Sequence, residues 1–266
     1  MAASGGGRRG GAGGRGRSGV AGEERYARQL ALPGLGVIGQ ERLAQTHVVV
    51  LGAGGLGFPV LTYLGAAGVG RISFIDADAV ELSNLNRQAL YTPAEVGQRK
   101  VSVALERLRN FAPEVNWAGT DAAITLERAR GLLANAQLAV DCADNFSARR
   151  ILAEAARQAR VPLVHGAVAG FEGQVAVLPG EGPPCLLCLY PEGQGSQVPP
   201  PVLGAVAGVV GSLMACEAIR LLLALGPRRT GSVLLVDVER GTFDWLAIPA
   251  RSDCPWCSPA VARPRS

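Results

Sequence analysis

The stretch "HVVVLGAGGLG", residues 47–57, decides the fold of this 266-residue chain. An apolar run leads directly into a glycine-rich loop, and "FPVLTYLGAAGVG" (58–70) follows with the composition of a helix that ends at glycine. A second apolar run, "RISFIDAD" (71–78), comes next. Strand, glycine loop, helix and strand form a βαβ unit, which predicts a parallel sheet.

The glycine loop has the spacing G-x-G-x-x-G at Gly52, Gly54 and Gly57. The first glycine permits a tight turn, the second lets a phosphate approach the backbone, and free N–H groups at the helix start face the anion. Asp76 ends the next strand, where a carboxylate can accept hydrogen bonds from ribose hydroxyls. We interpret this pair as a nucleotide site and not as a structural glycine turn. The pair does not identify the nucleotide, and alone it would favour a nicotinamide or flavin enzyme.

The rest of the chain continues the α/β pattern. Two short helices are expected in residues 23–46, on either side of a Pro33-Gly34 turn. From about residue 171 the strands become short and alternating, as in antiparallel additions. We therefore predict a Rossmann-like doubly wound sheet with a parallel core and antiparallel C-terminal strands, in a single domain over residues 23–258. The further expected elements are helices at about 98–110, 147–159 and 202–225, and strands at 138–145, 161–168, 171–178, 232–239 and 242–249.

The N-terminal segment differs from this body in composition. Residues 1–22 hold ten Gly, four Arg and no acidic residue, so we expect a disordered tail, and 259–266 should be a flexible C-terminus. Without the tail the chain has 22 basic and 22 acidic residues, so the basic pI does not indicate nucleic-acid binding by the body. The tail could contact RNA or DNA electrostatically, but we interpret it as a solvated extension. It lacks the apolar core of a secretory signal, and we expect a cytoplasmic protein.

One apolar segment approaches membrane-spanning length. Residues 202–226 read "VLGAVAGVVGSLMACEAIRLLLALG", and Glu217 and Arg220 interrupt the run before its end. Its small residues permit close packing against other elements. We predict a buried core helix and no membrane association.

The segment "DADAVELSNLNRQALYTPAEVGQRK" (76–100) distinguishes a dinucleotide from a triphosphate. It brings Asn84, Arg87 and Gln88 just beyond Asp76, and then Lys100, the only lysine in the chain. A triphosphate needs more cations than a dinucleotide, and Lys and Arg are not interchangeable around phosphate. We therefore expect a triphosphate, with Lys100 as one of its cations. The alternative is that this lysine is a random survivor of a codon bias.

A polar cluster stands at the end of the strand expected at 138–145. "DCADN" places Asp141, Asp144 and Asn145 at the sheet edge where this fold class binds ligands. Asp144 could hold Mg²⁺, which prefers one or two carboxylates together with phosphate oxygens and waters. The alternative is a helix N-cap, for which Asp144, Asn145 and Ser147 all qualify. No G-x-x-x-x-G-K-[ST] motif occurs, which excludes the usual P-loop.

Two C-x-x-C pairs lie 65 residues apart, Cys185 with Cys188 and Cys254 with Cys257. Together they can offer four thiolates to one tetrahedral ion, which predicts a structural zinc site that attaches the C-terminal segment to the body. With every coordination position taken by protein, the ion would have no place for substrate. The two remaining cysteines, Cys142 and Cys216, are expected to be small buried hydrophobes and not reactive thiols.

With these residues in hand, the chain resembles the MoeB/ThiF family of adenylyltransferases, relatives of the ubiquitin-activating enzymes. The likeness runs from about Glu24 to Cys257. It implies that ATP activates a ubiquitin-like sulfur carrier protein ending in Gly-Gly: the terminal carboxylate would attack the α-phosphorus, expel pyrophosphate and form an acyl-adenylate. The motifs are "RYARQ" (25–29), "GAGGLG" (52–57), "SNLNRQ" (83–88), "VGQRK" (96–100), "DCADN" (141–145) and the paired C-x-x-C knuckles.

The resemblance also implies roles for individual residues. Arg28 would act as an arginine finger on the partner subunit's ATP, which implies a homodimer. Asp76 would bind the ribose, Asp144 the magnesium, and Gly55 would lie against the nucleotide. The triphosphate would contact Asn84, Arg87 and Lys100. The implied catalytic residues are Arg28, Arg87, Lys100 and Asp144, and the implied nucleotide-binding residues are Gly52, Gly54, Gly55, Gly57, Asp76, Ser83, Asn84, Arg87, Gln88, Lys100, Asp144 and Asn145.

The chain departs from some relatives in the crossover segment after the first knuckle. Residues 190–204, "YPEGQGSQVPPPVLG", contain no cysteine that could form a covalent bond with the carrier. We expect adenylation without a covalent carrier–enzyme intermediate, and a separate persulfide protein as sulfur donor, in molybdopterin, thiamin or thiolated-tRNA synthesis. Two alternatives remain open: a zinc-containing NAD(P)-dependent oxidoreductase, and a non-catalytic scaffold that binds a ubiquitin-like protein.

Overall fold

The computed structural model describes residues 17–191 and 200–258 and contains one eight-stranded sheet in the order β3-β2-β1-β4-β5-β6-β7-β8. The first five strands run parallel, and β6, β7 and β8 are antiparallel additions at one side, as predicted. The strands are β1 (His47–Leu51), β2 (Arg71–Asp76), β3 (Asn116–Asp121), β4 (Leu138–Asp141), β5 (Leu163–Ala169), β6 (Glu172–Leu178), β7 (Ser232–Asp237) and β8 (Thr242–Ala247).

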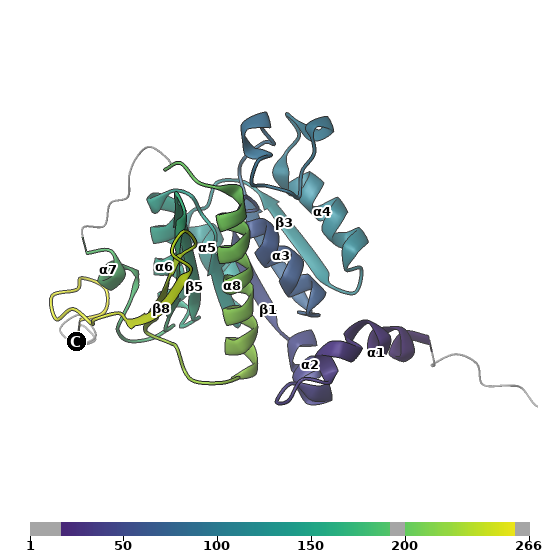
Figure 1. Cartoon of the computed structure of the whole chain (residues 1–266). Helices are drawn as coiled ribbons and strands as arrows, with labels where there is room; N and C mark the ends of the chain where they lie inside the picture. The colour runs from purple at the N-terminus through teal and green to yellow at the C-terminus, as the bar shows by residue number, and fades with distance from the viewer. Residues whose placement is uncertain (1–16, 192–199, 259–266) are drawn as a thin grey trace, which may run out of the picture.

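Helices cover both faces of the parallel region (Figure 1). Every residue of β1 is buried, as a central parallel strand requires. One face packs against α3 (Gly57–Ala66), α4 (Lys100–Phe111) and α8 (Gly204–Leu223), and the other packs against α5 (Leu126–Leu133) and α6 (Phe146–Gln158). The short elements are the 3₁₀ turns η1 (Leu82–Asn84) and η2 (Pro93–Glu95) and the helix α7 (Leu186–Leu189).

The long apolar helix α8 is a core element. In the described part of the chain it is the one helix long and apolar enough to cross a bilayer, yet it lies across β5 and β6 beside α3. Glycines make this approach possible: a Cβ at Gly166 would overlap the Met214 sulfur, and one at Gly211 would lie 2.7 Å from the Leu56 carbonyl oxygen. The prediction of a buried core helix is confirmed.

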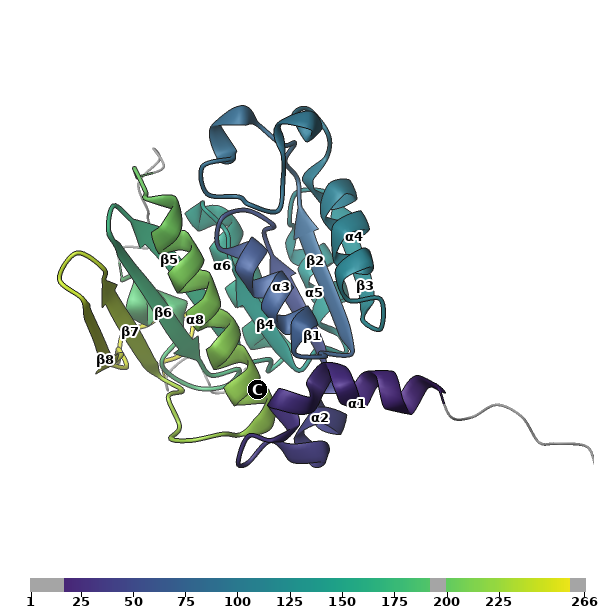
Figure 2. The same ribbon diagram turned by 45° about the vertical axis from the view of Figure 1, so that its right-hand side comes forward.

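The N-terminal helices α1 (Arg17–Leu30) and α2 (Gly36–Ala44) lie at the end of the sheet where the strands begin (Figure 2). The side-chain amides of Gln29 and Gln40 both donate to the Ala67 carbonyl oxygen at 2.9 Å, which fixes α1 and α2 to the end of α3. Helix α1 begins inside the segment expected to be a tail, because extending an existing helix costs far less than starting one. The rest of that expectation, residues 1–16, and the expected flexible end, 259–266, lie outside the described residues.

Candidate active site

A cavity of about 990 Å³ opens at the carboxyl ends of the parallel strands, and a second of about 260 Å³ adjoins it. The chain leaves β1 toward β2 and β3 on one side and later returns to β4 on the other, so the loops after these strands diverge here. Ligands of open α/β sheets bind at such switch points. Both cavities are lined by Gly52, Asp76, Asp78, Ala143 and Asp144.

The glycines of the loop divide into two groups. Gly52, Gly54 and Gly55 line the larger cavity, where absent side chains let a ligand approach the backbone. Gly57 does not line either cavity, and a Cβ there would overlap the Gly52 carbonyl oxygen. Gly57 thus permits close packing of α3 under the loop, and its assignment to nucleotide contact stays a prediction.

Asp76 ends β2 with its side chain turned under the glycine loop. Its Oδ2 accepts the Ala53 N–H at 2.8 Å, and its Oδ1 accepts the Asp78 N–H at 2.8 Å. Burial raises the pKa of this carboxyl, although the two N–H groups and the Lys100 charge act in the opposite direction. Because it lines both cavities, Asp76 joins the loop conformation to the ligand site.

Lys100 begins α4 and lines the larger cavity with its side chain only 4% exposed. Its ammonium is not free: Nζ lies 2.8 Å from Oδ2 of Asp78, a carboxylate that is itself 61% exposed. The Lys100 N–H also donates to the Asp78 carbonyl oxygen at 3.0 Å, so two distant segments are held together. Lys100 thus lies at the cavity, where its contact with a phosphate stays a prediction, and the sequence analysis missed the carboxylate that pairs with it.

The turn after β2 presents different residues from those expected. Asn86, Arg87 and Gln88 line the larger cavity, whereas Ser83 and Asn84 line neither. Asn84 is buried, and its carbonyl oxygen accepts the N–H groups of Arg87 and Gln88. The ligand contacts expected of Ser83 and Asn84 stay predictions, and Asn86, which the sequence analysis did not name, lines the larger cavity.

Arg87 and Gln88 offer complementary groups to a ligand. The Arg87 guanidinium donates to the Ser83 carbonyl oxygen and to Asn86 Oδ1, both at 3.0 Å, and both of these partners are neutral. Gln88 is buried, and its Oε1 accepts no hydrogen bond from the residues that the structure describes. A buried acceptor without a partner is costly unless a ligand supplies the donor.

The two roles expected of the polar cluster after β4, helix capping and cation binding, suit two adjacent residues. Asn145 is the N-cap of α6, since its Oδ1 accepts the Ala148 N–H at 2.9 Å, and it lines only the smaller cavity. Asp144 is exposed and lines both cavities, and among the described residues only the Asn145 amide donates a hydrogen bond to it, at 3.3 Å. The capping alternative therefore holds for Asn145, and the Asp144 carboxylate remains available to a cation.

Arg28 lies elsewhere. It belongs to α1, and this helix lies at the amino-terminal end of the strands (Figure 2). Arg28 lines neither cavity of its own chain. The structure therefore does not bring Arg28 together with the other predicted catalytic residues.

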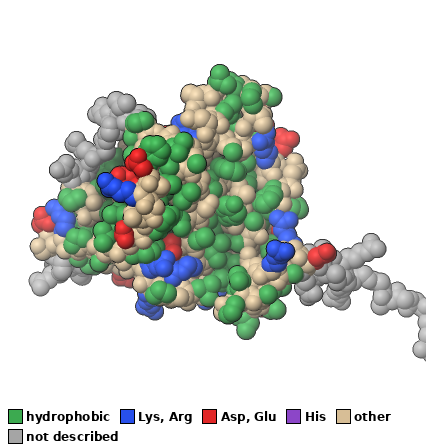
Figure 3. All heavy atoms as spheres, viewed as in Figure 1, with side chains coloured by type: hydrophobic (Ala, Val, Ile, Leu, Met, Phe, Trp, Pro, Cys, Tyr) green, Lys and Arg blue, Asp and Glu red, His purple; other side chains and the backbone are tan. Residues whose placement is uncertain are grey.

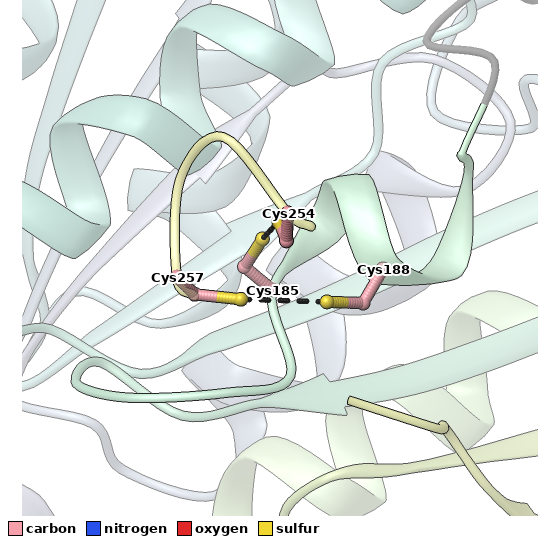
Figure 4. A group of neighbouring side chains, drawn as sticks. All are labelled: Cys185, Cys188, Cys254 and Cys257. Atoms are coloured by element: carbon pink, nitrogen blue, oxygen red, sulfur yellow. Dashed lines mark hydrogen bonds between the residues drawn. The ribbon is translucent and has the colours of Figure 1, made fainter. Parts of the chain in front are cut away.

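The four knuckle cysteines meet as expected (Figure 4). All four sulfurs lie within 4.8 Å of one another, with Cys185 to Cys254 at 3.5 Å and Cys188 to Cys257 at 3.4 Å. A disulfide would need about 2.05 Å, whereas thiolates around a tetrahedral zinc ion lie about 3.8 Å apart. Burial raises the pKa of Cys254, but backbone N–H groups of Trp256 and Cys257 and neighbouring thiols together lower it to about 7. The cluster can bind zinc. The two other cysteines differ, since Cys142 is buried as expected and Cys216 is exposed on α8.

A buried polar chain that the sequence did not reveal reaches the wall of the larger cavity. Asp141 Oδ2 lies 2.7 Å from His165 Nδ1, and His165 Nε2 lies 2.8 Å from the Tyr190 hydroxyl. Gln174 donates to the same hydroxyl, and both Tyr190 and Gln174 line the cavity. One signal was available: parallel pairing of β4 with β5 makes Asp141 and His165 direct neighbours, but the register is not readable from sequence.

Comparison with known proteins gives consistent results. The sequence pattern of the ThiF family matches residues 26–256. The chain is 44% identical over 249 residues to the sulfur carrier protein adenylyltransferase of Thermus thermophilus. The aligned region covers 88% of this chain and 90% of that protein. It is 38% identical to the SAMP-activating enzyme E1 of Haloferax volcanii, with 88% of each covered. It is 41% identical to the adenylyltransferase and sulfurtransferase MOCS3 of Sus scrofa, of which it spans only 52%.

Solved structures show the same fold. The structure of Escherichia coli MccB with ATP superposes with a TM-score of 0.75 at 22% identity, over 88% of this chain and 74% of that one. MccB in complex with N-formylated MccA gives a TM-score of 0.77 at 21% identity, over 91% and 77% of the two chains.

Proposed function

The chain belongs to the ThiF family, and from this premise we propose that it activates a small ubiquitin-like sulfur carrier protein with ATP. In this reaction the carrier's C-terminal glycine carboxylate attacks the α-phosphorus, the bond to the β-phosphate oxygen breaks, and pyrophosphate leaves. The observation that carries the proposal is that Asp76, Arg87, Lys100 and Asp144 line one large cavity at the switch point. The carrier would serve molybdopterin, thiamin or thiolated-tRNA synthesis.

The two joined cavities suit the parts of ATP. The smaller has apolar walls from Ile75, Ile124 and Ile151, which suit a purine base. Asp76 lies between the cavities, where its carboxylate would bind the ribose hydroxyls. The triphosphate would then extend into the larger cavity toward Arg87 and Lys100.

The Lys100–Asp78 ion pair could exchange its carboxylate for a phosphate oxygen when ATP binds. In the free protein Lys100 is neutralised by Asp78, whose exposed carboxylate loses little when it returns to water. A phosphate oxygen would replace Asp78 as the partner of Lys100, and Arg87 would contact the same anion. Nucleotidyl transfer depends mainly on such positioning and charge neutralisation as the leaving group develops.

Two metals fit the residues present. Asp144 would hold Mg²⁺, which would neutralise phosphate charge, since one exposed carboxylate beside a phosphate cavity suits this ion. Zinc would bind the cluster of Cys185, Cys188, Cys254 and Cys257, whose sulfur spacing is close to that of a tetrahedral site. With four protein ligands it would clamp the C-terminal segment and take no part in the chemistry.

We also propose a homodimer with Arg28 acting on the partner subunit's ATP. Two observations support this: Arg28 cannot line its own cavity from α1, and hydrophobic side chains gather over α8 and α3 on one face (Figure 3). On α8, the side chains of Val209, Leu213 and Ile219 are only partly buried. An apolar surface of this kind is typical of subunit interfaces.

The carrier would enter beside β7 and β8. Phe171, Leu235 and Phe243 are 50%, 41% and 51% exposed, and Leu235 lines the larger cavity. Such a hydrophobic rim suits the apolar face of a small folded partner. Because residues 190–204 contain no cysteine, we propose that the enzyme forms no covalent bond with the carrier and that a separate persulfide protein supplies sulfur.

ATP–pyrophosphate exchange tests the proposal. The purified protein should exchange labelled pyrophosphate into ATP only when a carrier ending in Gly-Gly is present. A carrier that lacks its last glycine is the matched control and should give background exchange. Absence of exchange with every ubiquitin-like carrier of the same cell would contradict the proposal, and tight NADH binding without ATP binding would support the oxidoreductase alternative.

A further inference from the structure

The polar chain of Asp141, His165 and Tyr190 has no role in the proposed chemistry so far, although it ends at the cavity wall. Its members come from three separate elements: the end of β4, the middle of β5, and the residue that follows α7. Asp141 and His165 are completely buried. A buried charged group next to a buried imidazole is costly to maintain unless each hydrogen bond is satisfied.

The directions of the hydrogen bonds between Asp141, His165 and Tyr190 follow from the Asp141 carboxylate. The Asp141 carboxylate can only accept, and its Oδ1 already accepts the Ala143 N–H at 3.0 Å. His165 Nδ1 must therefore carry the proton that it shares with Asp141 Oδ2. In a neutral imidazole, Nε2 is then an acceptor, and the Tyr190 hydroxyl donates to it.

His165 stays neutral in these surroundings. The groups that face it are Asp141, Arg149 and Tyr190. Burial lowers the pKa of His165 and Arg149 lowers it further, which together outweigh the hydrogen bond and charge of Asp141. The direction of the Tyr190 hydroxyl proton is thus fixed.

The Tyr190 phenol is also fixed in place. Its ring packs edge-on against Phe146 at 5.6 Å and against the His165 ring at 5.5 Å. Gln174 occupies one lone pair of the hydroxyl oxygen as a donor, and the Arg149 guanidinium lies near the same hydroxyl. Because the only hydroxyl proton points inward to His165, the oxygen can offer the cavity an acceptor but no donor.

We propose that Tyr190 accepts a hydrogen bond from a backbone N–H of the carrier's C-terminal tail, and that His165 and Asp141 are positioning residues that hold the phenol in this acceptor state. An acceptor attracts a peptide N–H and repels the oxygens of a carboxylate or a phosphate. Tyr190 would thus guide the peptide part of the tail along one wall, while the terminal carboxylate and the triphosphate lie toward Arg87 and Lys100. The inference rests on the proposed function and adds the binding of the tail to it.

The first test compares Tyr190→Phe with wild type in ATP–pyrophosphate exchange. Loss of one hydrogen bond to the carrier should raise the carrier KM roughly tenfold and leave the Kd for ATP unchanged. His165→Asn should raise the carrier KM similarly, because its amide can still donate to Asp141 but leaves Tyr190 without its acceptor. Tyr26→Phe is the matched control, since its hydroxyl bonds Glu114 on the surface, away from the cavity. An unchanged carrier KM in Tyr190→Phe would overturn the proposal.

The second test identifies the donor and separates binding from folding. The probes are semisynthetic ubiquitin-like carriers ending in Gly-Gly, in which an ester replaces one of the last three peptide bonds, so that one N–H becomes an oxygen. At one position the ester should raise the KM of wild type roughly tenfold and leave the KM of Tyr190→Phe nearly unchanged. Equal ester effects on both proteins at all three positions would overturn the inference. If wild type shows no exchange even with the all-amide carrier, the proposed function fails instead.

Discussion

The two sides of the sheet assemble their functional groups in different ways. On the proposed nucleotide side, β3, β2, β1 and β4, most groups stand at the end of a strand or shortly after it, as Gly52, Asp76 and Asp144 do. On the proposed carrier side, β5 to β8, the cysteine cluster joins residues that are distant in sequence, and so does the polar chain that runs from Asp141 at the end of β4 to His165 and Tyr190. The proposed nucleotide site is thus formed mainly by the backbone of short segments at the strand ends. The groups on the proposed carrier side are brought together by packing between distant segments. Substitutions on the two sides should fail in different ways.

The largest expected effect is on the nucleotide side. Lys100→Ala should lower the exchange rate about 10³-fold, because a buried cation at developing phosphate charge is lost. Lys100→Arg should also be impaired, since a longer planar group does not fit a position that is 4% exposed.

The control for Lys100 is Arg109→Ala, an exposed residue in the last turn of the same helix, which should exchange normally. Normal activity of Lys100→Arg would mean that only charge, and not shape, matters at this position.

Loss of the metal cluster should affect the carrier side first. Cys254→Ser should lower Tm by roughly 10 °C and lower the zinc content measured by mass spectrometry, because the proposed structural ion would hold the C-terminal segment. ATP binding should persist, since the nucleotide loop lies in another part of the sheet. Ser252→Ala, at an exposed position beside the cluster, is the control. Unchanged zinc content in the cysteine variant would show that the cluster is not a zinc site.

Alanine substitutions at Gly57 and Gly54 separate the contribution of the glycine loop to stability from its contribution to ATP binding. Gly57→Ala should destabilise the fold by about 3 kcal/mol, because its Cβ would overlap backbone that cannot move. Gly54→Ala meets only the Gln88 amide, at 3.3 Å, so it should cost little stability but weaken ATP binding roughly tenfold. Thermal unfolding and calorimetric titration measure the two effects. The reverse pattern would contradict the assignment of Gly57 to packing.

The smallest effect concerns pH and the carrier side. Burial lowers the pKa values of His165 and His47, so below about pH 6.5 the unfolded chain takes up protons that the folded protein does not. Stability should therefore fall as the pH drops from about 6.5. His165→Asn should reduce this loss by about 1 kcal/mol between pH 6.5 and 5.5. Denaturant unfolding of both proteins at the two pH values gives the change in the free energy of unfolding. An equal change in wild type and in His165→Asn would mean that His165 is protonated in the folded protein.

The same contrast explains what could be predicted from sequence. Gly52, Asp76 and Lys100 could be singled out from the sequence because each belongs to a short motif, and all three line the larger cavity. Asp78 was missed because its role depends on contact with a residue 22 positions later. The strand β3 and helix α5 were not expected, since β3 is a polar edge strand, "NWAGTD", without an apolar run, and α5 is short.

On the proposed carrier side, the sequence pattern predicted only the cysteine cluster, because the spacing of the cysteines itself indicates a metal site. Two C-x-x-C pairs require no knowledge of register, and the four sulfurs do meet. The position of Tyr190 against His165 depends on how β4, β5 and α7 pack, which no local pattern encodes. The exposed Cys216 has the same cause: the sequence of an apolar helix does not show which of its faces the sheet covers.

The most direct test of the whole account is the intact mass of carrier and enzyme after a single turnover with ATP and Mg²⁺. We predict a carrier that gains one AMP, release of pyrophosphate in equal amount, and an enzyme of unchanged mass. A carrier without AMP would contradict the proposed adenylation. An enzyme covalently joined to the carrier would contradict the proposal that the two form no bond.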